Sequence, residues 1–105
     1  MTRVACIDIG TVTARLAVAD VEGGRVTRML KQSTICNLGE GLTRTGMIAE
    51  AAAGRVLACV DSYLAAARQA RAPRICCTLT SAARDAGNSD ALLAELAARG
   101  LHRSE

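Results

Sequence analysis

Three short apolar runs occupy the first third of the chain, and a longer stretch with a different spacing follows them. The runs at residues 4–9 and 15–20 are rich in Val, Ile and Ala, which is typical of strands covered on both faces. The run at residues 25–32 alternates more weakly and follows a Gly-Gly pair that favours a tight hairpin. The pattern therefore predicts three strands joined as an antiparallel meander.

The longer stretch, residues 49–71, has apolar side chains every three or four positions. This spacing predicts one amphipathic helix of roughly six turns, which Pro73 ends. The residues expected to face the core are Ala53, Val56, Leu57, Val60, Tyr63, Leu64 and Ala67. A helix with one buried face is therefore expected to cover the meander.

After this helix the pattern predicts a fourth strand over residues 74–79 and two further helices. The first is short and capped by Thr80 or Ser81, and the second covers residues 90–99 and stops at Gly100. The inward residues of the second are expected to be Leu92, Leu93 and Leu96. Because a strand, a helix and a strand form a crossover, the fourth strand is expected to lie parallel to the first.

These elements predict an α/β fold. The chain has 105 residues, which is one domain at most, and half of it is hydrophobic, which is enough to bury a core. With one Tyr and no Phe or Trp, that core is expected to be aliphatic. Residues 33–46 contain three glycines, and their apolar positions recur with neither the helical nor the strand spacing. This segment is expected to form an ordered loop or a short turn.

Charge and hydropathy exclude several kinds of partner. The net charge of +3 is spread along the chain without a basic run, and aromatic side chains for base stacking are lacking, so no nucleic-acid partner is expected. No apolar run reaches the roughly 18–20 residues of a membrane span, and no signal peptide is recognisable. We therefore expect a cytoplasmic protein without a membrane partner.

The five cysteines form no Cys-x-x-Cys pair, and the single histidine, His102, is far from them in sequence. This spacing argues against a zinc site. The cysteines within apolar runs are expected to be small buried hydrophobes in a reducing compartment: they are Cys6, Cys59, Cys76 and Cys77.

The first candidate for chemistry is the turn after the first strand. Asp8 lies inside an apolar run, where a carboxylate is costly unless it is paired, hydrogen-bonded or near a metal. Gly10 allows a tight turn and close approach of a ligand, and Thr11 and Thr13 add hydroxyls beside backbone N–H groups. The segment is typical of a phosphate-binding loop. The alternative is an ordinary hairpin, which also favours Gly and Thr.

Two further segments combine glycine, hydroxyl and charged residues. In the first, Glu40 lies between two glycines and is four residues from Arg44, which fits either a ligand-binding loop or a solvated loop with a surface ion pair. In the second, residues 78–88, hydroxyls fall at a strand end and a helix N-terminus, where N–H groups favour anions. Arg84 adds a candidate phosphate contact, although a capped helix with a solvent-facing arginine explains the segment equally well.

Taken together, three segments resemble one known family. They are Ile7-Asp8-Ile9-Gly10-Thr11-Val12-Thr13-Ala14-Arg15-Leu16, then Leu38-Gly39-Glu40-Gly41-Leu42 with Thr45-Gly46, then Thr80-Ser81-Ala82-Ala83-Arg84-Asp85-Ala86-Gly87-Asn88. Their order and spacing resemble the N-terminal part of the Ppx/GppA phosphatases over about residues 3–105. These are exopolyphosphatases and guanosine pentaphosphate phosphohydrolases of the actin, heat-shock chaperone and sugar-kinase superfamily.

The resemblance implies a ribonuclease-H-like lobe and a phosphoanhydride hydrolase that uses Mg²⁺. Its substrate would be inorganic polyphosphate or a guanosine nucleotide. By match of position, Gly10, Thr11 and Thr13 would bind phosphate, Asp8 would act near the metal and the attacking water, and Arg84 would contact phosphates. A sugar or metabolite kinase of the same superfamily is the alternative enzyme.

The chain departs from the family pattern in three respects. Val12 stands where the family usually has Asn, and Asn37 stands where it usually has Arg. The glutamate that serves as catalytic base and a second glycine-rich loop have no match, and a fifth strand would begin only near residue 103. We therefore expect residues 1–105 to be an N-terminal lobe truncated at its C-terminal end, inactive by itself or a non-catalytic phosphate-binding remnant.

Without a fifth strand, residues 75–77 of the fourth strand would form an exposed edge. Such an edge invites a homodimer or another edge-strand association.

Overall fold

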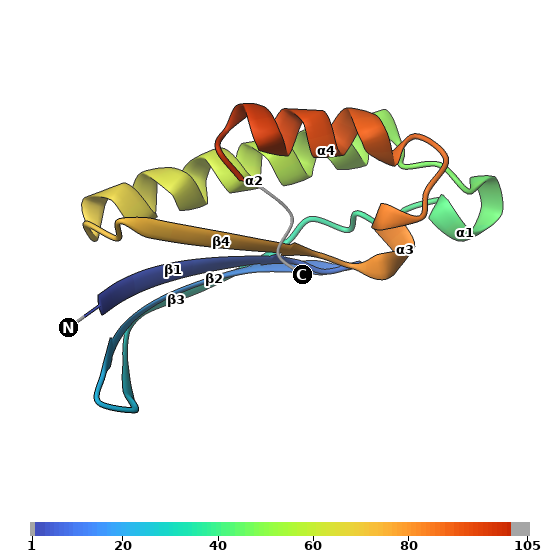
Figure 1. Cartoon of the computed structure of the whole chain (residues 1–105). Coiled ribbons are helices and arrows are strands. Elements are labelled where there is room, and N and C mark those ends of the chain that lie inside the picture. Colours follow the sequence, from blue (N-terminus) through green and yellow to red (C-terminus); the bar gives the residue numbers. More distant parts are fainter. Residues whose placement is uncertain (1, 102–105) are drawn as a thin grey trace.

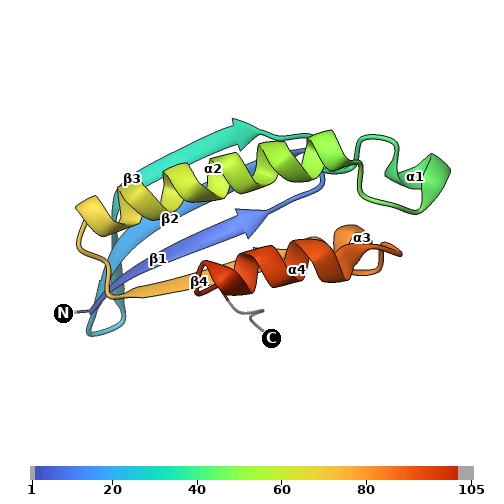
Figure 2. The same cartoon turned by 90° about the horizontal axis from the view of Figure 1, so that it is seen from above.

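The computed structural model describes residues 2–101, with the backbone alone at residue 29. Its elements, in chain order, are β1 (Thr2–Ile9), β2 (Thr13–Glu22), β3 (Arg25–Ile35), α1 (Leu42–Thr45), α2 (Glu50–Gln69), β4 (Arg74–Leu79), α3 (Ser81–Arg84) and α4 (Ser89–Ala98). The strands form one sheet in the order β3-β2-β1-β4. Helices α2 and α4 lie side by side on one face of it (Figures 1 and 2), so the predicted α/β fold is confirmed.

The strand pairing confirms the predicted topology. Strands β1, β2 and β3 form the antiparallel meander, and β4 runs parallel to β1. Strand β3 extends to Ile35, three residues beyond the predicted end, because its last residues pair with the start of β2. Pairing with a neighbouring strand has here overridden a weak local pattern.

Within residues 2–101 the helices cover only one face of the sheet, which corrects the expectation that both faces are covered. Ala5, Ile7 and Ile9 of β1 are buried under the helices, whereas Cys6 and Asp8 between them are exposed. We call the uncovered side, which carries Cys6 and Asp8, the open face. The prediction that Cys6 and Cys76 are buried is therefore wrong, while Cys59 and Cys77 are buried as expected. The runs look largely apolar because several of their outward positions hold small side chains, among them Cys6, Ala17 and Ala19.

The core lies between the sheet and α2. Val56, Val60, Tyr63, Leu64 and Ala67 are buried as predicted, whereas the predicted Ala53 and Leu57 are only partly buried and Ala52 and Cys59 take inward positions. In α4, Leu92 and Leu96 are buried and Leu93 is partly buried. The Tyr63 hydroxyl donates to the Ala14 carbonyl at 3.1 Å and lies 2.7 Å from the Thr34 hydroxyl. The single aromatic side chain therefore joins α2 to β2 and β3, the middle strand and one outer strand of the meander.

The helix ends follow the predicted stop signals. Helix α2 ends at Gln69, and Arg71 adopts φ 60° two residues before Pro73. Helix α4 ends at Ala98, and Gly100 adopts φ 82°. The segment predicted as a loop or short turn contains the one-turn helix α1, bounded by Gly41 and Gly46 in left-handed conformation.

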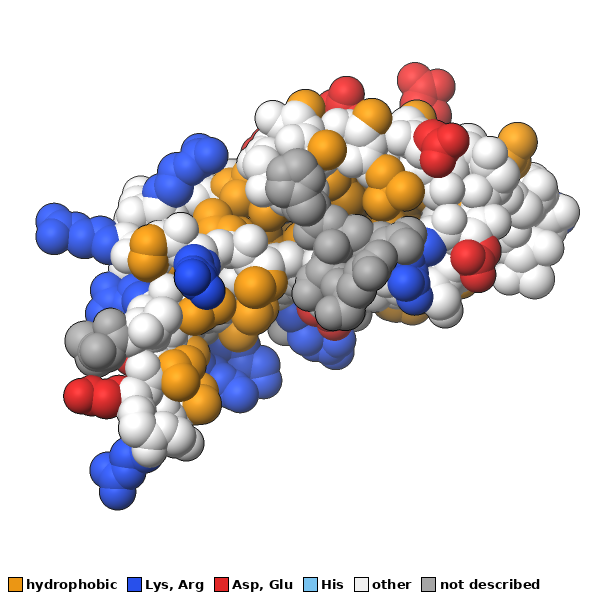
Figure 3. Space-filling model, viewed as in Figure 1, with side chains coloured by type: hydrophobic (Ala, Val, Ile, Leu, Met, Phe, Trp, Pro, Cys, Tyr) orange, Lys and Arg blue, Asp and Glu red, His pale blue; other side chains and the backbone are white. Residues whose placement is uncertain are grey.

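Both edges of the sheet, β3 and β4, are open within residues 2–101, and β4 is the edge beside α4. Within residues 2–101, β4 pairs with β1 alone, so its other edge carries no partner strand. Figure 3, seen from the β4 side, shows hydrophobic side chains gathered between α4 and the sheet. The expected start of a fifth strand near residue 103 lies outside the described residues. None of the helices described is long and apolar enough to cross a membrane.

Candidate phosphate-binding site

The parallel pairing of β1 and β4 brings the first and third candidate segments together. Asp8 of β1 is paired in register with Thr78 of β4. The Thr78 hydroxyl donates a hydrogen bond of 2.7 Å to Oδ1 of Asp8. Because both strands end at the same edge of the sheet, the turns that follow them also meet there. The hydroxyl of Thr11 lies 3.1 Å from that of Thr80, and the Thr80 N–H donates to the Ile9 carbonyl at 2.9 Å.

Gly10 is required by the geometry of the first turn. Its N–H donates to the Thr13 carbonyl at 3.1 Å, and a Cβ at this position would lie only 2.8 Å from that carbonyl oxygen. Among residues 2–101, the N–H groups of Thr11 and Val12 make no hydrogen bond to another protein group. Thr13 begins β2 beside them. Two free N–H groups next to two hydroxyls form the kind of concave turn that binds anions.

The second candidate segment is held against this turn by backbone contacts. The carbonyl of Thr11 accepts a hydrogen bond of 2.9 Å from Gly39, and the carbonyl of Val12 accepts bonds from Cys36 and Asn37. A Cβ on Gly39 would lie 2.5 Å from Cγ2 of Thr11. Gly39 is therefore a positioning residue that the sequence marked only as part of a weak Gly-x-Gly pattern.

Glu40 pairs with Arg55 of α2 and not with Arg44. Its Oε2 lies 3.2 Å from the Arg55 guanidinium, which also donates to the carbonyls of Cys36 and Asn37. The predicted partner was the nearest cation in sequence, whereas α2 brings a distant one closer. Arg55 thereby fixes the segment that lies against the Thr11 turn.

Asp8 is exposed on the open face, so the expectation of a buried carboxylate is wrong. A period-2 strand exposes every second residue when helices cover one side only. Because Asp8 is exposed, its carboxylate is not desolvated, and it needs no partner or metal to offset such a cost. The exposure leaves a carboxylate that solvent and a ligand can reach, with Thr78 on one side and Arg15 paired opposite on β2.

Helix α3 lacks the capped N-terminus that the sequence predicted as an anion site. It is a single turn, and no side chain caps its N-terminus. The Thr80 hydroxyl, one of the predicted caps, contacts Thr11 instead. Arg84 is exposed, and its side chain makes no hydrogen bond or ion pair within the described part of the chain. The structure thus brings Asp8, Gly10, Thr11 and Thr13 to one edge of the sheet, whereas no side-chain hydrogen bond or ion pair joins Arg84 to them within residues 2–101.

Asn88 is a positioning residue that sequence reasoning missed. Its side-chain amide accepts from the Ile48 N–H at 2.8 Å and donates to the Ile48 carbonyl at 2.9 Å. The neighbouring Gly87 N–H donates to the Gly46 carbonyl at 2.9 Å. These bonds join the segments after α1 and α3. In the sequence, the one sign of these hydrogen bonds is the position of Asn88 at the end of the third segment, residues 80–88.

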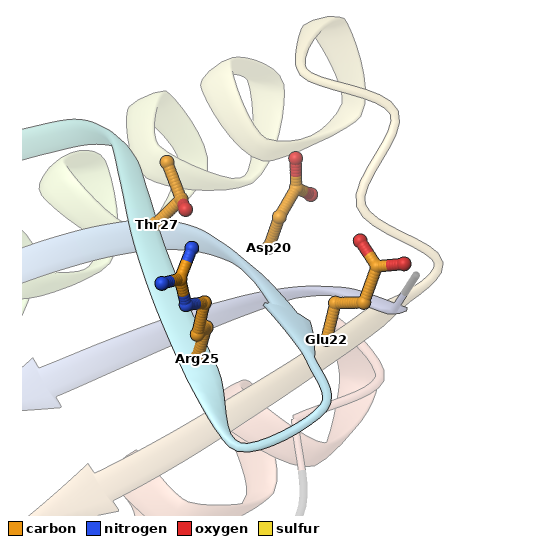
Figure 4. A pocket seen from close by; sticks show the side chains of 4 residues that line it. All are labelled: Asp20, Glu22, Arg25 and Thr27. Atoms are coloured by element: carbon orange, nitrogen blue, oxygen red, sulfur yellow. The ribbon is translucent and has the colours of Figure 1, made fainter.

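A separate hollow lies at the far end of the β2–β3 hairpin. It has a volume of about 460 Å³ and is lined by Asp20, Glu22, Arg25 and Thr27 (Figure 4). None of the predicted site residues lines it. Asp20 pairs with the Arg3 guanidinium at 2.8 Å, which holds the pKa of that carboxyl below its usual range.

The oxygen donors at Asp8 suit a hard cation such as Mg²⁺. Mg²⁺ takes oxygen ligands and commonly binds through one or two carboxylates together with substrate phosphates and water. Asp8 supplies one such carboxylate, and residues 2–101 contain no cluster of three or more His, Cys, Asp or Glu side chains that could hold an ion unaided. A metal at this edge would therefore depend on the phosphates of a ligand.

Comparison with known proteins shows the family to which this chain belongs. The model of the Ppx/GppA phosphatase family matches residues 17–99. The chain belongs to this family. It is 37% identical over 98 residues to exopolyphosphatase 2 of Mycobacterium tuberculosis, covering 90% of this chain and 31% of that protein. With exopolyphosphatase 1 of Mycobacterium bovis the identity is 28%, over 90% of this chain and 28% of the relative.

Solved structures of the Ppx/GppA family have the same fold. The crystal structure of the Aquifex aeolicus family member superposes with a TM-score of 0.90 at 25% identity, over 98% of this chain and 35% of that one. An exopolyphosphatase from Cytophaga hutchinsonii gives a TM-score of 0.85 at 26% identity, over 90% of this chain and 30% of that one. The fold is therefore the predicted ribonuclease-H-like lobe. This chain spans about a third of the length of these relatives.

Proposed function

We propose that this chain provides the first phosphate loop of a phosphoanhydride hydrolase that acts on inorganic polyphosphate or guanosine pentaphosphate. Membership of the Ppx/GppA phosphatase family supports the reaction class. The single observation that carries the assignment to this edge is the meeting of the Thr11 turn with the ends of β1 and β4. There the Asp8–Thr78 hydrogen bond of 2.7 Å and the Thr11–Thr80 contact of 3.1 Å lie next to free N–H groups.

The reaction would transfer the terminal phosphoryl group to water. Such a transfer depends on positioning and on neutralising charge on the phosphate oxygens. In this proposal the N–H groups of Thr11 and Val12 and the hydroxyls of Thr11 and Thr13 bind a phosphate. Asp8, oriented by Thr78, accepts a hydrogen bond from the attacking water. Mg²⁺, bound through Asp8 and the phosphates, would supply charge neutralisation.

We further propose that residues 1–105 bind phosphate chains without turning them over. No glutamate at a position matching the family's catalytic base is present, and no second glycine-rich phosphate loop follows β4 within these residues. Val12 and Asn37 replace residues that would add polar contacts to phosphate. The five cysteines are free, which keeps a reducing cytoplasm as the expected compartment.

Calorimetric titration with tripolyphosphate and Mg²⁺ tests binding, and release of inorganic phosphate tests turnover. We expect saturable binding and no release. Thr11→Val keeps the methyl group beside Gly39 but removes the hydroxyl. Losing one hydrogen bond to a charged ligand costs about 1.5–3 kcal/mol, so the affinity should fall roughly 10- to 150-fold.

The matched control is Thr27→Val, which changes an exposed threonine on β3 far from the site. Its affinity should equal that of the unchanged chain. Equal affinities for the unchanged chain, Thr11→Val and Thr27→Val would contradict the assignment of the phosphate site to the Thr11 turn. Phosphate release that Asp8→Asn abolishes would contradict the inactivity of the chain. Transfer of phosphate from ATP to a sugar would favour the kinase alternative.

A further inference from the structure

Two thiols lie next to each other on the open face of the sheet. Cys6 of β1 and Cys76 of β4 are paired in register in the parallel ladder, and both are exposed. Side chains at paired positions point to the same side of a sheet, and the backbones of neighbouring strands are about 4.8 Å apart. The pairing therefore places two thiols side by side where a ligand from solvent can reach them.

The surroundings leave this pair accessible. On its other side Cys6 is paired with Ala17 of β2, whose methyl group fills little space above the sheet. Beyond Cys76 the described chain has no further strand. The remaining cysteines, Cys36, Cys59 and Cys77, are buried. Cys77 follows Cys76 directly but faces the core, so the two exposed thiols form a pair of their own.

The strand spacing leaves room for an ion between the two sulfurs. Side chains that leave neighbouring strands on the same side are separated by the strand spacing of about 4.8 Å. Two metal–sulfur bonds in line, each of about 2.3 Å as in zinc thiolates, span about 4.6 Å and match that spacing. A disulfide is also compatible with it, because the Cα atoms of a disulfide lie about 4.4–6.8 Å apart, so the ion requires the two thiols to be reduced.

The number of ligands selects the class of ion. Structural zinc takes four ligands, and residues 2–101 offer no cluster of three or more His, Cys, Asp or Glu side chains. Two thiolates alone suit a soft monovalent ion, and among the groups that thiolates select, Cu(I) is the monovalent one. The neighbouring pairs on the same face add Arg74 on one side and Asp8 on the other, so one cation and one anion lie near the thiols.

We propose that Cys6 and Cys76 form a two-thiolate site for Cu(I). Each thiol releases its proton to solvent as its sulfur binds, so two protons leave and the bound unit carries one net negative charge. The copper remains Cu(I), and no electron is transferred. The occupied site joins β1 to β4 two residues before the Asp8–Thr78 hydrogen bond.

An anaerobic competition titration of the 105-residue chain with Cu(I) and the colorimetric chelator bathocuproine disulfonate tests this site. The unchanged chain is expected to withdraw one Cu(I) per molecule from the chelator. Cys6→Ser and Cys76→Ser should each leave the copper with the chelator at the same concentrations. Both positions are exposed, and circular dichroism of the two variants should match that of the unchanged chain.

The matched control is Cys77→Ala, which removes the adjacent buried thiol and leaves the exposed pair intact. It should bind copper as the unchanged chain does. The proposal is overturned if the unchanged chain takes no copper from the chelator. It is also overturned if the folded Cys6→Ser and Cys76→Ser variants hold as much copper as the unchanged chain.

Discussion

Gly39 lies against Thr11 more closely than any side chain would permit. A Cβ there would be 2.5 Å from Cγ2 of Thr11, while the two residues are also joined by a backbone hydrogen bond of 2.9 Å. Gly54 lies in the second turn of α2, and a Cβ added to it would meet no other atom within 4 Å. The same substitution at these two glycines should therefore have opposite effects on stability.

Gly39→Ala is expected to lower the free energy of unfolding by about 1–3 kcal/mol, because the turn must move to relieve the clash. Gly54→Ala should raise it by about 0.5–1 kcal/mol, because alanine costs less entropy in a helix. Urea unfolding followed by circular dichroism measures both. Equal effects of the two substitutions would contradict the packing of residues 36–39 against the Thr11 turn.

Tyr63 makes the stability of the core sensitive to alkaline pH. Burial raises its pKa to about 12, and burial raises the pKa of Cys77 to about 11. A free tyrosine has a pKa of about 10, so the folded state holds this proton more tightly than the unfolded state. The resulting stability is complete below pH about 10 and is lost as the pH rises towards 12.

Because Tyr63 is the only tyrosine, absorbance of its phenolate reports this residue alone. We expect the absorbance midpoint to lie above pH about 11 and to coincide with loss of the circular dichroism signal. Tyr63→Phe should unfold over a broader alkaline range set by the cysteines. A phenolate midpoint near the ordinary value of about 10 in a folded chain would contradict the burial of Tyr63.

At the scale of the elements, the spacing of apolar residues predicted most of the strands and helices. It predicted only part of how these elements pack against one another. The crossover rule placed β4 parallel to β1, but only the register shows that Thr78 faces Asp8. Period-2 alternation identified β1 without telling which faces would be covered, so Asp8, Cys6 and Cys76 were expected to be buried. The Glu40–Arg55 pair joins residues 15 positions apart, which no local pattern indicates.

Helix α4 is fixed to α2 by an ion pair as well as by its leucines. The Arg99 guanidinium lies 2.6 Å from Asp61 of α2 and 3.0 Å from Glu95 of α4, and it lowers the pKa of Asp61. A carboxylate with a lowered pKa adds stability above the unfolded value of about 3.9, and that stability is lost as the pH falls below it. Acid should therefore weaken the contact between α4 and α2.

Asp61→Asn is expected to remove part of the loss of thermal stability between pH about 5 and 2. Asp85→Asn, at an exposed aspartate that accepts no side-chain hydrogen bond within residues 2–101, should leave the pH dependence unchanged. Melting temperatures at several pH values measure both effects. Identical pH profiles for the two variants would contradict a role for the ion pair.

At the scale of the whole molecule, the free edge of β4 is the feature with the largest consequence. No strand within residues 2–101 pairs with its outer backbone groups, which can therefore accept another strand, and hydrophobic side chains gather between β4 and α4 (Figure 3). We expect the 105-residue chain to self-associate by pairing β4 with a second copy. A charged side chain on this edge should prevent the pairing.

Sedimentation velocity at increasing concentration measures the association. Cys76→Lys, on the open face of β4, should keep the chain monomeric, because edge lysines oppose strand addition. Val21→Lys, at an exposed position of the inner strand β2, should leave the association unchanged. A chain that stays monomeric at all concentrations would contradict the expected edge pairing.

The central claim is that the Thr11 turn and the ends of β1 and β4 form half of a phosphate site. Backbone amide chemical shifts, recorded while tripolyphosphate and Mg²⁺ are added, test it most directly. The account predicts the largest shifts at Thr11, Val12 and Thr80 and none at the hairpin glycines Gly23 and Gly24. Shifts confined to the hollow around Arg25, with none at Thr11 and Val12, would contradict it.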